Sequence, residues 1–141
     1  MNTPRGIRNH NPGNIVRNGV AWQGLADDQS SDPRFAVFEA PVWGLRALCH
    51  LLLTYYDHHH LCTLSAIVHR WAPPHENDTG AYVDHLSQLT GFGRATPLNL
   101  HDQDVLIAVA KAIVQHENGQ DPYDDVVYFN AAKMAGVGNT I

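Results

Sequence analysis

The feature that most constrains this chain is an apolar helical segment that ends on a carboxylate. Residues 106–119 read LIAVAKAIVQHENG, and their apolar side chains recur with the three- and four-residue spacing of a buried helix face. Glu117 lies four residues after Ile113 and therefore continues that face. Asn118 and Gly119 tolerate the left-handed backbone that ends a helix. The pattern predicts a central helix whose last turn carries a partly buried glutamate.

This position gives the Glu117 carboxyl group two physical reasons for a raised pKa. Burial disfavours the charged form, and the negative end of a helix dipole acts in the same direction. A glutamate of this kind can keep its proton near neutral pH, as a general acid must. The alternative is a helix-terminal glutamate that reaches water and has no chemical role.

Composition narrows the classes of function. The 141 residues carry a formal net charge of −5 and no cluster of lysine and arginine, which argues against nucleic acid and anionic membrane surfaces as partners. Cys49 and Cys62 lie in apolar helical surroundings, where free thiols made in a reducing compartment are expected. No apolar run reaches the roughly 20 residues of a membrane span. The first residues do not resemble a signal peptide. We therefore expect a soluble protein that is made in the cytoplasm and does not insert stably into a membrane.

The first 40 residues are rich in Gly, Asn, Pro and Asp. Residues 6–15 read as consecutive tight turns, with Pro12-Gly13 suited to a type II turn. The alternating, aromatic-rich segment 34–38 predicts a short β-hairpin in which residues 21–23 pair loosely with it. A loop region this long in a small protein is often functional.

Residues 41–141 show helical periodicity. Besides the helix that ends at Glu117, helices are expected over 41–57, 64–71, 79–90 and 124–135. Three adjacent histidines, 58–60, close the first of these but lack the one-face spacing of a metal site, so no metal and no cofactor are expected. We predict a single domain, residues 1–141, in a mainly α (α+β) fold: 1–40 form loops and one small β-hairpin, and 41–141 form four to five helices.

Two further carboxylates are candidates for chemistry. Glu76 lies in a loop before a helix N-terminus, where the dipole stabilises the ionised form that suits a base or an electrostatic stabiliser. Glu39, after the predicted strand, is the third candidate. No serine or cysteine lies in a nucleophile pattern, and the glycines form no phosphate-binding motif. The residues therefore favour acid–base chemistry by carboxylates.

The helix that ends at Glu117 resembles the catalytic helix of soluble lytic transglycosylases and goose-type lysozymes. That family carries an apolar helix, then Glu-Ser-Gly and, a few residues later, a proline. Residues 117–122 read ENGQDP, so Asn118 stands in the place of the usual serine. The resemblance implies that Glu117 is the general acid.

The front of the chain is similar to the lysozyme-like glucosaminidases. Their pattern is an Asn-rich turn that ends in Gly-Ile or Asn-Ile, a Trp-x-Gly, a short aromatic strand and a helix. The matching segments are NHNPGNI at 9–15, WQG at 22–24, FAVF at 35–38 and GLRA at 44–47. Tyr82, before Gly91, fits their later helix. Together these segments resemble small phage-encoded virion or lysis proteins.

The two resemblances occur in an unusual order. In lysozyme-like enzymes the catalytic helix precedes the Asn-rich turn, whereas here it follows. A circular permutation of a lysozyme-like fold would reconcile them, since domain termini often lie close together. This hypothesis predicts that Glu117 faces a cleft whose other wall is residues 7–24.

The resemblance implies a peptidoglycan-degrading enzyme, a lytic transglycosylase or muramidase that cleaves the β-1,4 bond between N-acetylmuramic acid and N-acetylglucosamine. A hydrolase would need a second carboxylate, Glu76 or Glu39, whereas a transglycosylase needs one acid/base. The lack of a clear second carboxylate favours the transglycosylase. The expected contacts to the glycan strand are Asn9, Asn11, Asn14, Gln23, Tyr82 and Tyr123.

Two other classes of function stay open, of which a histidine-rich metal-binding protein is the weaker. A non-catalytic structural module of a virion or secretion apparatus would bind glycan without cleaving it, and Asn118 and the acidic net charge are compatible with that role. As the enzyme or as this module, the protein would act in the periplasm or cell wall after release, virion injection or secretion. Its further partners would be virion components or an immunity or inhibitor protein.

Overall fold

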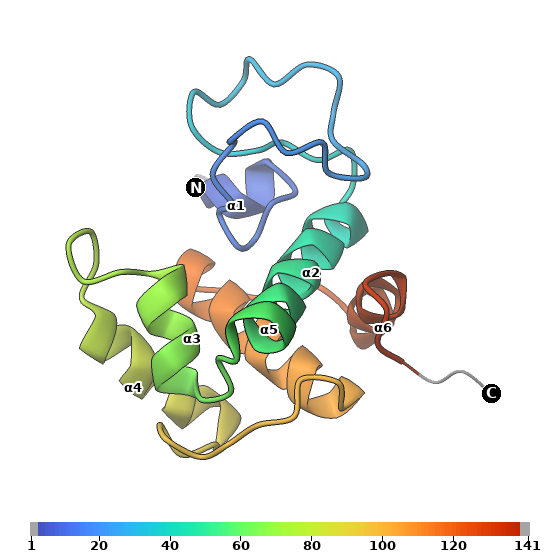
Figure 1. Ribbon diagram of the computed structural model, residues 1–141. Coiled ribbons are helices and arrows are strands. Elements are labelled where there is room, and N and C mark those ends of the chain that lie inside the picture. Colours follow the sequence, from blue (N-terminus) through green and yellow to red (C-terminus); the bar gives the residue numbers. More distant parts are fainter. Residues whose placement is uncertain (1–2, 139–141) are drawn as a thin grey trace.

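A computed structural model describes residues 3–138, which form six helices joined by loops (Figure 1). The five longer helices are α2 (Pro41–His59), α3 (Leu64–Trp71), α4 (Thr79–Thr90), α5 (Gln103–Asn118) and α6 (Asp125–Met134). The short α1 (Arg5–Arg8) lies within the N-terminal loops. Within residues 3–138, no helix has both the length and the hydrophobicity of a membrane span. The expected mainly helical fold class is confirmed.

Local sequence signals account for the helix ends. The side chains of Thr63 and Asp78 each accept a backbone N–H at 3.1 Å in the first turn of α3 and α4. Gly119, with a φ of 71°, ends α5 in the left-handed conformation. Consequently α3 and α4 span the predicted residues, whereas α2 continues two residues past the predicted 57 and ends at a left-handed His60.

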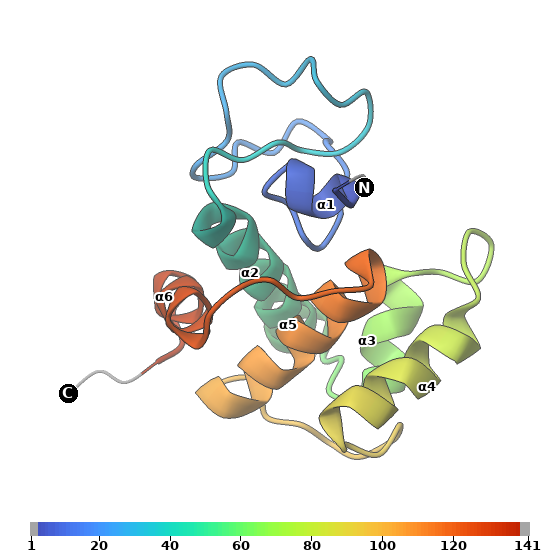
Figure 2. The same ribbon diagram turned by 180° about the vertical axis from the view of Figure 1, so that it is seen from behind.

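The core surrounds α5. This helix packs against α2, α4 and α6, which lie around it in both views (Figures 1 and 2). Five of its apolar side chains have no exposed surface: Leu106, Val109, Ala110, Ile113 and Val114. Burial of one such face supplies most of the stability of a helix in a globular protein, so the predicted central helix is confirmed.

Cys49 and Cys62 are free thiols, and Cys49 is fully buried.

The N-terminal segment 34–38 does not form the predicted hairpin. It makes two isolated antiparallel bridges, Val16–Phe35 on one side and Leu25–Phe38 on the other. The side chain of Gln29 bonds both the N–H and the carbonyl of Val37, at 2.8 Å each, in the way that a neighbouring strand would. The expected pairing with residues 21–23 is therefore wrong, because several loop side chains, Gln29 among them, and other loop segments take the backbone groups of 34–38.

A buried carboxylate holds these loops together. Asp32, whose side chain is 2% exposed, accepts two hydrogen bonds from Arg5, at 2.6 and 2.7 Å, and one from Asn9 at 2.8 Å. It also accepts the backbone N–H groups of Arg34 and Phe35 at 2.8 and 2.7 Å. The hydrogen bond from Arg5 outweighs burial and holds the pKa of Asp32 well below its usual value. Asp32 thus joins α1 to segment 34–38.

A second, smaller apolar cluster seats the loops on α2. Its buried members are Ile15, Ala36, Phe38 and Ala47, and partly buried aromatic and aliphatic side chains surround them. Gly44 of α2 makes this close approach possible, since a Cβ there would overlap the backbone carbonyl of His10. The N-terminal loops are therefore fixed over α2 and beside the end of α5 (Figure 2).

Candidate functional site

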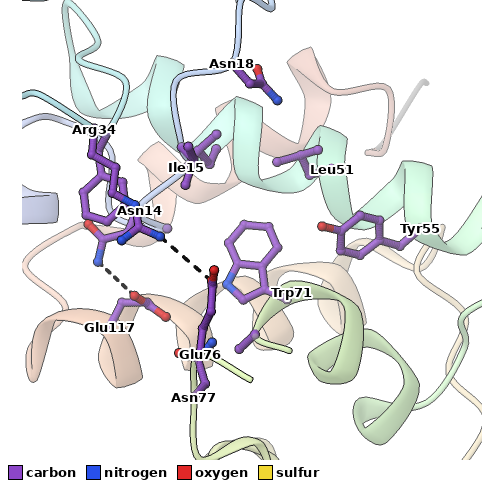
Figure 3. Close-up of a pocket in the computed structure, with 14 residues that line it drawn as sticks. Asn14, Ile15, Asn18, Arg34, Leu51, Tyr55, Trp71, Glu76, Asn77 and Glu117 are labelled. Atoms are coloured by element: carbon purple, nitrogen blue, oxygen red, sulfur yellow. Dashed lines mark hydrogen bonds and ion pairs between the residues drawn. The ribbon is translucent and has the colours of Figure 1, made fainter. Parts of the chain in front are cut away.

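Glu117 lines an open cleft between the N-terminal loops and the helices (Figure 3). The cleft has a volume of about 310 Å³. Its lining comes from the loop 13–18, from Arg34 and Phe35, from α2 and from the segment 71–77. The residues of the loop wall fall within 7–24, so the prediction that Glu117 lies at a cleft lined by this part of the chain is confirmed.

The carboxylate of Glu117 accepts hydrogen bonds on both of its oxygens. The amide of Asn14 donates to Oε1 at 2.8 Å, and the hydroxyl of Tyr82 donates to Oε2 at 2.7 Å. Asn14 comes from the N-terminal loop and Tyr82 from α4, where it is 2% exposed. Burial first, and then the charge of Glu117, raises the pKa of Tyr82 well above its ordinary value, so the phenol remains a donor. Two distant parts of the chain thus fix the orientation of one carboxylate.

A tight turn places Asn14. The Asn14 N–H donates to the carbonyl of Asn11 at 2.9 Å, and Asn14 itself adopts a φ of 53°, which asparagine tolerates. A type II turn would instead need a positive φ at Gly13, so the predicted turn type is wrong. A Cβ on Gly13 would lie 3.2 Å from the ring of Trp71. The turn therefore lies directly against one wall of the cleft.

Asn118 ties the end of α5 to the same turn. Its amide donates to the carbonyl of Pro12 at 2.8 Å and to that of Val114 at 2.9 Å. A Cβ on Gly6 would lie 2.6 Å from Asn118 Oδ1, which shows how closely α1 approaches this helix end. Asn118 thus holds Glu117 beside the loop that carries Asn14.

The three candidate carboxylates differ in whether they line the cleft that contains Glu117. Glu76 lines the same cleft as Glu117. Its Oε2 lies 3.9 Å from Nη2 of Arg34, and its Oε1 lies 3.6 Å from His75 Nε2. Glu39 is exposed in the turn before α2 and does not line the cleft. The structure therefore brings Glu76, and not Glu39, together with Glu117.

Most of the expected glycan contacts lie elsewhere. Asn14 lines the cleft, but Asn9 and Asn11 are buried, with amides that bond Asp32 and the backbone of the loops. We correct the expectation for these two residues, because the loops already use their polar atoms. The remaining three are also not part of the lining: Gln23 is exposed in a turn, Tyr82 is buried behind Glu117, and Tyr123 packs edge-on against Tyr128.

A comparison with known proteins places the chain in a phage protein family. It is 38% identical over 122 residues to Protein P5 of Pseudoalteromonas phage PM2, and the match covers 84% of this chain and 74% of that protein. The chain belongs to this phage protein's family. No protein-family model matches it.

One charged cleft residue of this phage-family protein was not anticipated. Arg34 begins the aromatic segment 34–38, and its guanidinium lies over the ring of Phe35, 5.3 Å from the centroid. The sequence marks Arg34 only as a basic residue next to an aromatic residue at the start of a predicted strand. Many surface residues fit that description, so it does not identify a cleft residue. No group of three or more His, Cys, Asp or Glu side chains in residues 3–138 is placed to hold a metal ion.

A pair of histidines lies behind Tyr82. The His116 ring stacks on the Tyr82 ring with 3.7 Å between centroids, and its Nδ1 lies 2.8 Å from Nδ1 of His85. One of these nitrogens must donate and the other accept, so at least one ring is neutral. Burial, and to a smaller extent His85, lowers the pKa of His116, against an opposing effect of Glu117.

We expect the His116 ring to titrate below the ordinary histidine pKa of about 6.5. Because the unfolded chain then takes up this proton first, stability from the pair is complete above about pH 6.5 and is lost as the pH falls through the folded pKa. An NMR titration of the ring measures this directly. In His85→Gln, which removes the lowering effect of His85, the pKa of His116 should rise and the stability should depend less on pH. A midpoint at or above 6.5 in the wild type would contradict the expectation.

Proposed function

We propose that this protein cleaves the glycan strands of peptidoglycan, with Glu117 as the general acid. The observation that carries the proposal is the carboxylate of Glu117, which is held at a cleft by donors on both oxygens, from Asn14 and Tyr82. A general acid must be fixed beside the bond that breaks. A glutamate that only ends a helix needs no such arrangement.

In the proposed reaction, Glu117 donates a proton to the glycosidic oxygen as the β-1,4 bond from N-acetylmuramic acid breaks, and positive charge develops on the sugar ring. In a transglycosylase, the same carboxylate then takes the proton of the C6 hydroxyl as that oxygen closes an anhydro ring. In a muramidase, Glu76 would stabilise the charged ring or hold the water. Glu76 lines the same cleft, so both versions are compatible with the site.

The aromatic lining supports a sugar ligand. Tyr55 and Trp71 line the cleft and meet edge to face, with 6.2 Å between centroids. Aromatic rings of this kind offer flat faces on which sugar rings stack. Glycan contacts would therefore come from these rings.

We also propose that the fold is lysozyme-like and circularly permuted. In support, the helix that carries the acid is the fifth of the six helices in residues 3–138 and contacts α1, so that its end lies beside the N-terminal turns (Figure 2). The phage relative fits a protein that reaches the periplasm or cell wall by lysis or virion entry.

The alternative is a module that binds glycan without cleaving it. Its support is the formal net charge of −5, since an enzyme that degrades the anionic cell wall would gain from positive charge. Such a module would use the same cleft.

Digestion of purified peptidoglycan sacculi distinguishes these functions. We expect soluble fragments whose muramic acid ends are anhydro sugars by mass spectrometry, which would indicate a transglycosylase, whereas reducing muramic acid ends would indicate a muramidase. Protein that sediments with sacculi and releases no fragments would contradict the proposed cleavage and favour the binding module.

A further inference from the structure

Arg34 is the single lysine or arginine among the cleft-lining residues that the structure describes. The other charged side chains of the lining are the carboxylates Glu76 and Glu117. Figure 3 shows Arg34 beside Asn14, across from Glu76. Its guanidinium is therefore the group in this cleft that would attract an anionic part of a ligand.

The backbone of Arg34 is anchored, and its guanidinium lies beside an aromatic ring. The Arg34 N–H donates to the buried Asp32 at 2.8 Å, and the guanidinium lies over the Phe35 ring. The side chain is still 57% exposed. Arg34 is thus anchored at its base and open to a ligand at its tip.

The interaction of Arg34 with Glu76 is weak. The contact to Glu76 is a single approach at 3.9 Å, longer than a hydrogen bond, and the Glu76 side chain is 54% exposed. Exposed ion pairs of this kind contribute little to stability. A ligand carboxylate that met two guanidinium N–H groups would form a stronger, bidentate pair and displace Glu76.

The substrate of the proposed function supplies such a group. Each muramic acid carries a lactyl ether whose carboxyl group either is free or bears a peptide stem with its own carboxylates, whereas a polymer of N-acetylglucosamine alone carries none. We propose that Arg34 is a carboxylate-binding subsite that selects muramic-acid-containing strands over uncharged N-acetylglucosamine strands. This inference rests on the proposed function, since it names the part of the substrate that the same cleft recognises.

Calorimetric titration tests the subsite by binding, independently of cleavage. The full chain carries Glu117→Gln so that each ligand stays intact. The ligands are a peptidoglycan tetrasaccharide with peptide stems, the same glycan after an amidase has removed the stems, and chitotetraose, which has no carboxylate. The first two ligands separate a stem carboxylate from the lactyl carboxylate as the group bound.

We expect Arg34→Gln to weaken binding of at least one carboxylate-bearing ligand about tenfold and to leave binding of chitotetraose within twofold. Arg34→Lys keeps the positive charge but not the paired N–H donors of the guanidinium, so it should weaken binding less than Arg34→Gln does. Glu76→Gln should strengthen binding of the same ligand, because it removes the competing carboxylate. Arg94→Gln is the matched control, since Arg94 is similarly exposed and pairs with Asp84 away from the cleft.

Equal weakening for chitotetraose would show that Arg34 acts only on the structure of the cleft and would overturn the subsite. Unchanged binding of all three ligands, or no binding by the protein without the Arg34 change, would overturn it as well. If the carboxylate-bearing ligands bind as expected but the wild type cleaves none of them, the subsite stands and the proposed cleavage falls.

Discussion

Replacement of Glu117 by glutamine should lower the rate of peptidoglycan lysis at least about a hundredfold, because a positioned general acid contributes on that order or more. The amide has nearly the same volume and can still accept the hydrogen bond from Asn14. Its N–H protons are not acidic enough to be transferred to the glycosidic oxygen. The measurement is the initial rate at which soluble fragments leave purified sacculi, with the unfolding midpoint of each variant as a check on folding.

Two other carboxylates complete the test: Glu39 is a control, and Glu76 distinguishes the two possible reactions. Glu39→Gln changes an exposed glutamate outside the cleft and should leave the rate of lysis unchanged. Glu76→Gln should also leave it nearly unchanged if the reaction is a transglycosylation, and should lower it strongly if a second carboxylate is required. Equal rates for the wild type and Glu117→Gln would remove Glu117 as the acid.

The Gly44→Ala substitution should destabilise the protein by at least about 3 kcal/mol, among the largest effects expected of one methyl group. A Cβ at this position in α2 would overlap the carbonyl oxygen of His10 and lie 2.9 Å from its carbonyl carbon. These are backbone atoms of a packed loop, so they cannot rotate away as a side-chain tip would. Denaturant unfolding of the variant measures the loss in the free energy of unfolding.

Gly80→Ala is the matched control for this change. Gly80 lies in α4, and a Cβ there would meet only Asp78 Oδ1 at 4.0 Å. Alanine should therefore stabilise the protein by about 0.5–1 kcal/mol through its higher helix propensity. If Gly44→Ala were as stable as the wild type, the N-terminal loop would not be seated on α2, and the position of Asn14 beside Glu117 would lose its support.

The helices could be predicted from sequence because their signals are local. The apolar spacing of α5 and the caps Thr63, Asp78 and Gly119 each act within a few residues. For that reason α3 and α4 begin and end where the pattern predicts. The four residues of α1 are too few to show a helical period, so the Gly- and Asn-rich composition of this region predicts turns instead.

The N-terminal loops could not be predicted in this way. Their organisation depends on Asp32, whose partners Arg5 and Asn9 lie 27 and 23 residues away. No spacing rule links residues at such separations. The aromatic pattern of 34–38 indicated a strand, but Gln29 and the flanking loops take its backbone bonds, and no hairpin forms.

The sequence predicted the central carboxylate of the candidate site, Glu117, but not how the neighbouring side chains are arranged around it. The apolar face identified Glu117, and the family resemblance led to the expectation that this residue faces the N-terminal loops. The Asn14 and Tyr82 contacts join residues 103 and 35 positions away from Glu117, so their roles as hydrogen-bond donors appear only in three dimensions. Asn9 and Asn11 have the same composition signal as Asn14, yet they hold the loop and do not line the cleft.

The most direct measurement of the central claim is a crystal structure of Glu117→Gln with a peptidoglycan tetrasaccharide. We predict that the glycan lies in the cleft, with the oxygen between a muramic acid and the next N-acetylglucosamine within hydrogen-bonding distance of the side chain at position 117. Glycan bound outside the cleft, or a glycosidic oxygen out of reach of that side chain, would contradict the claim.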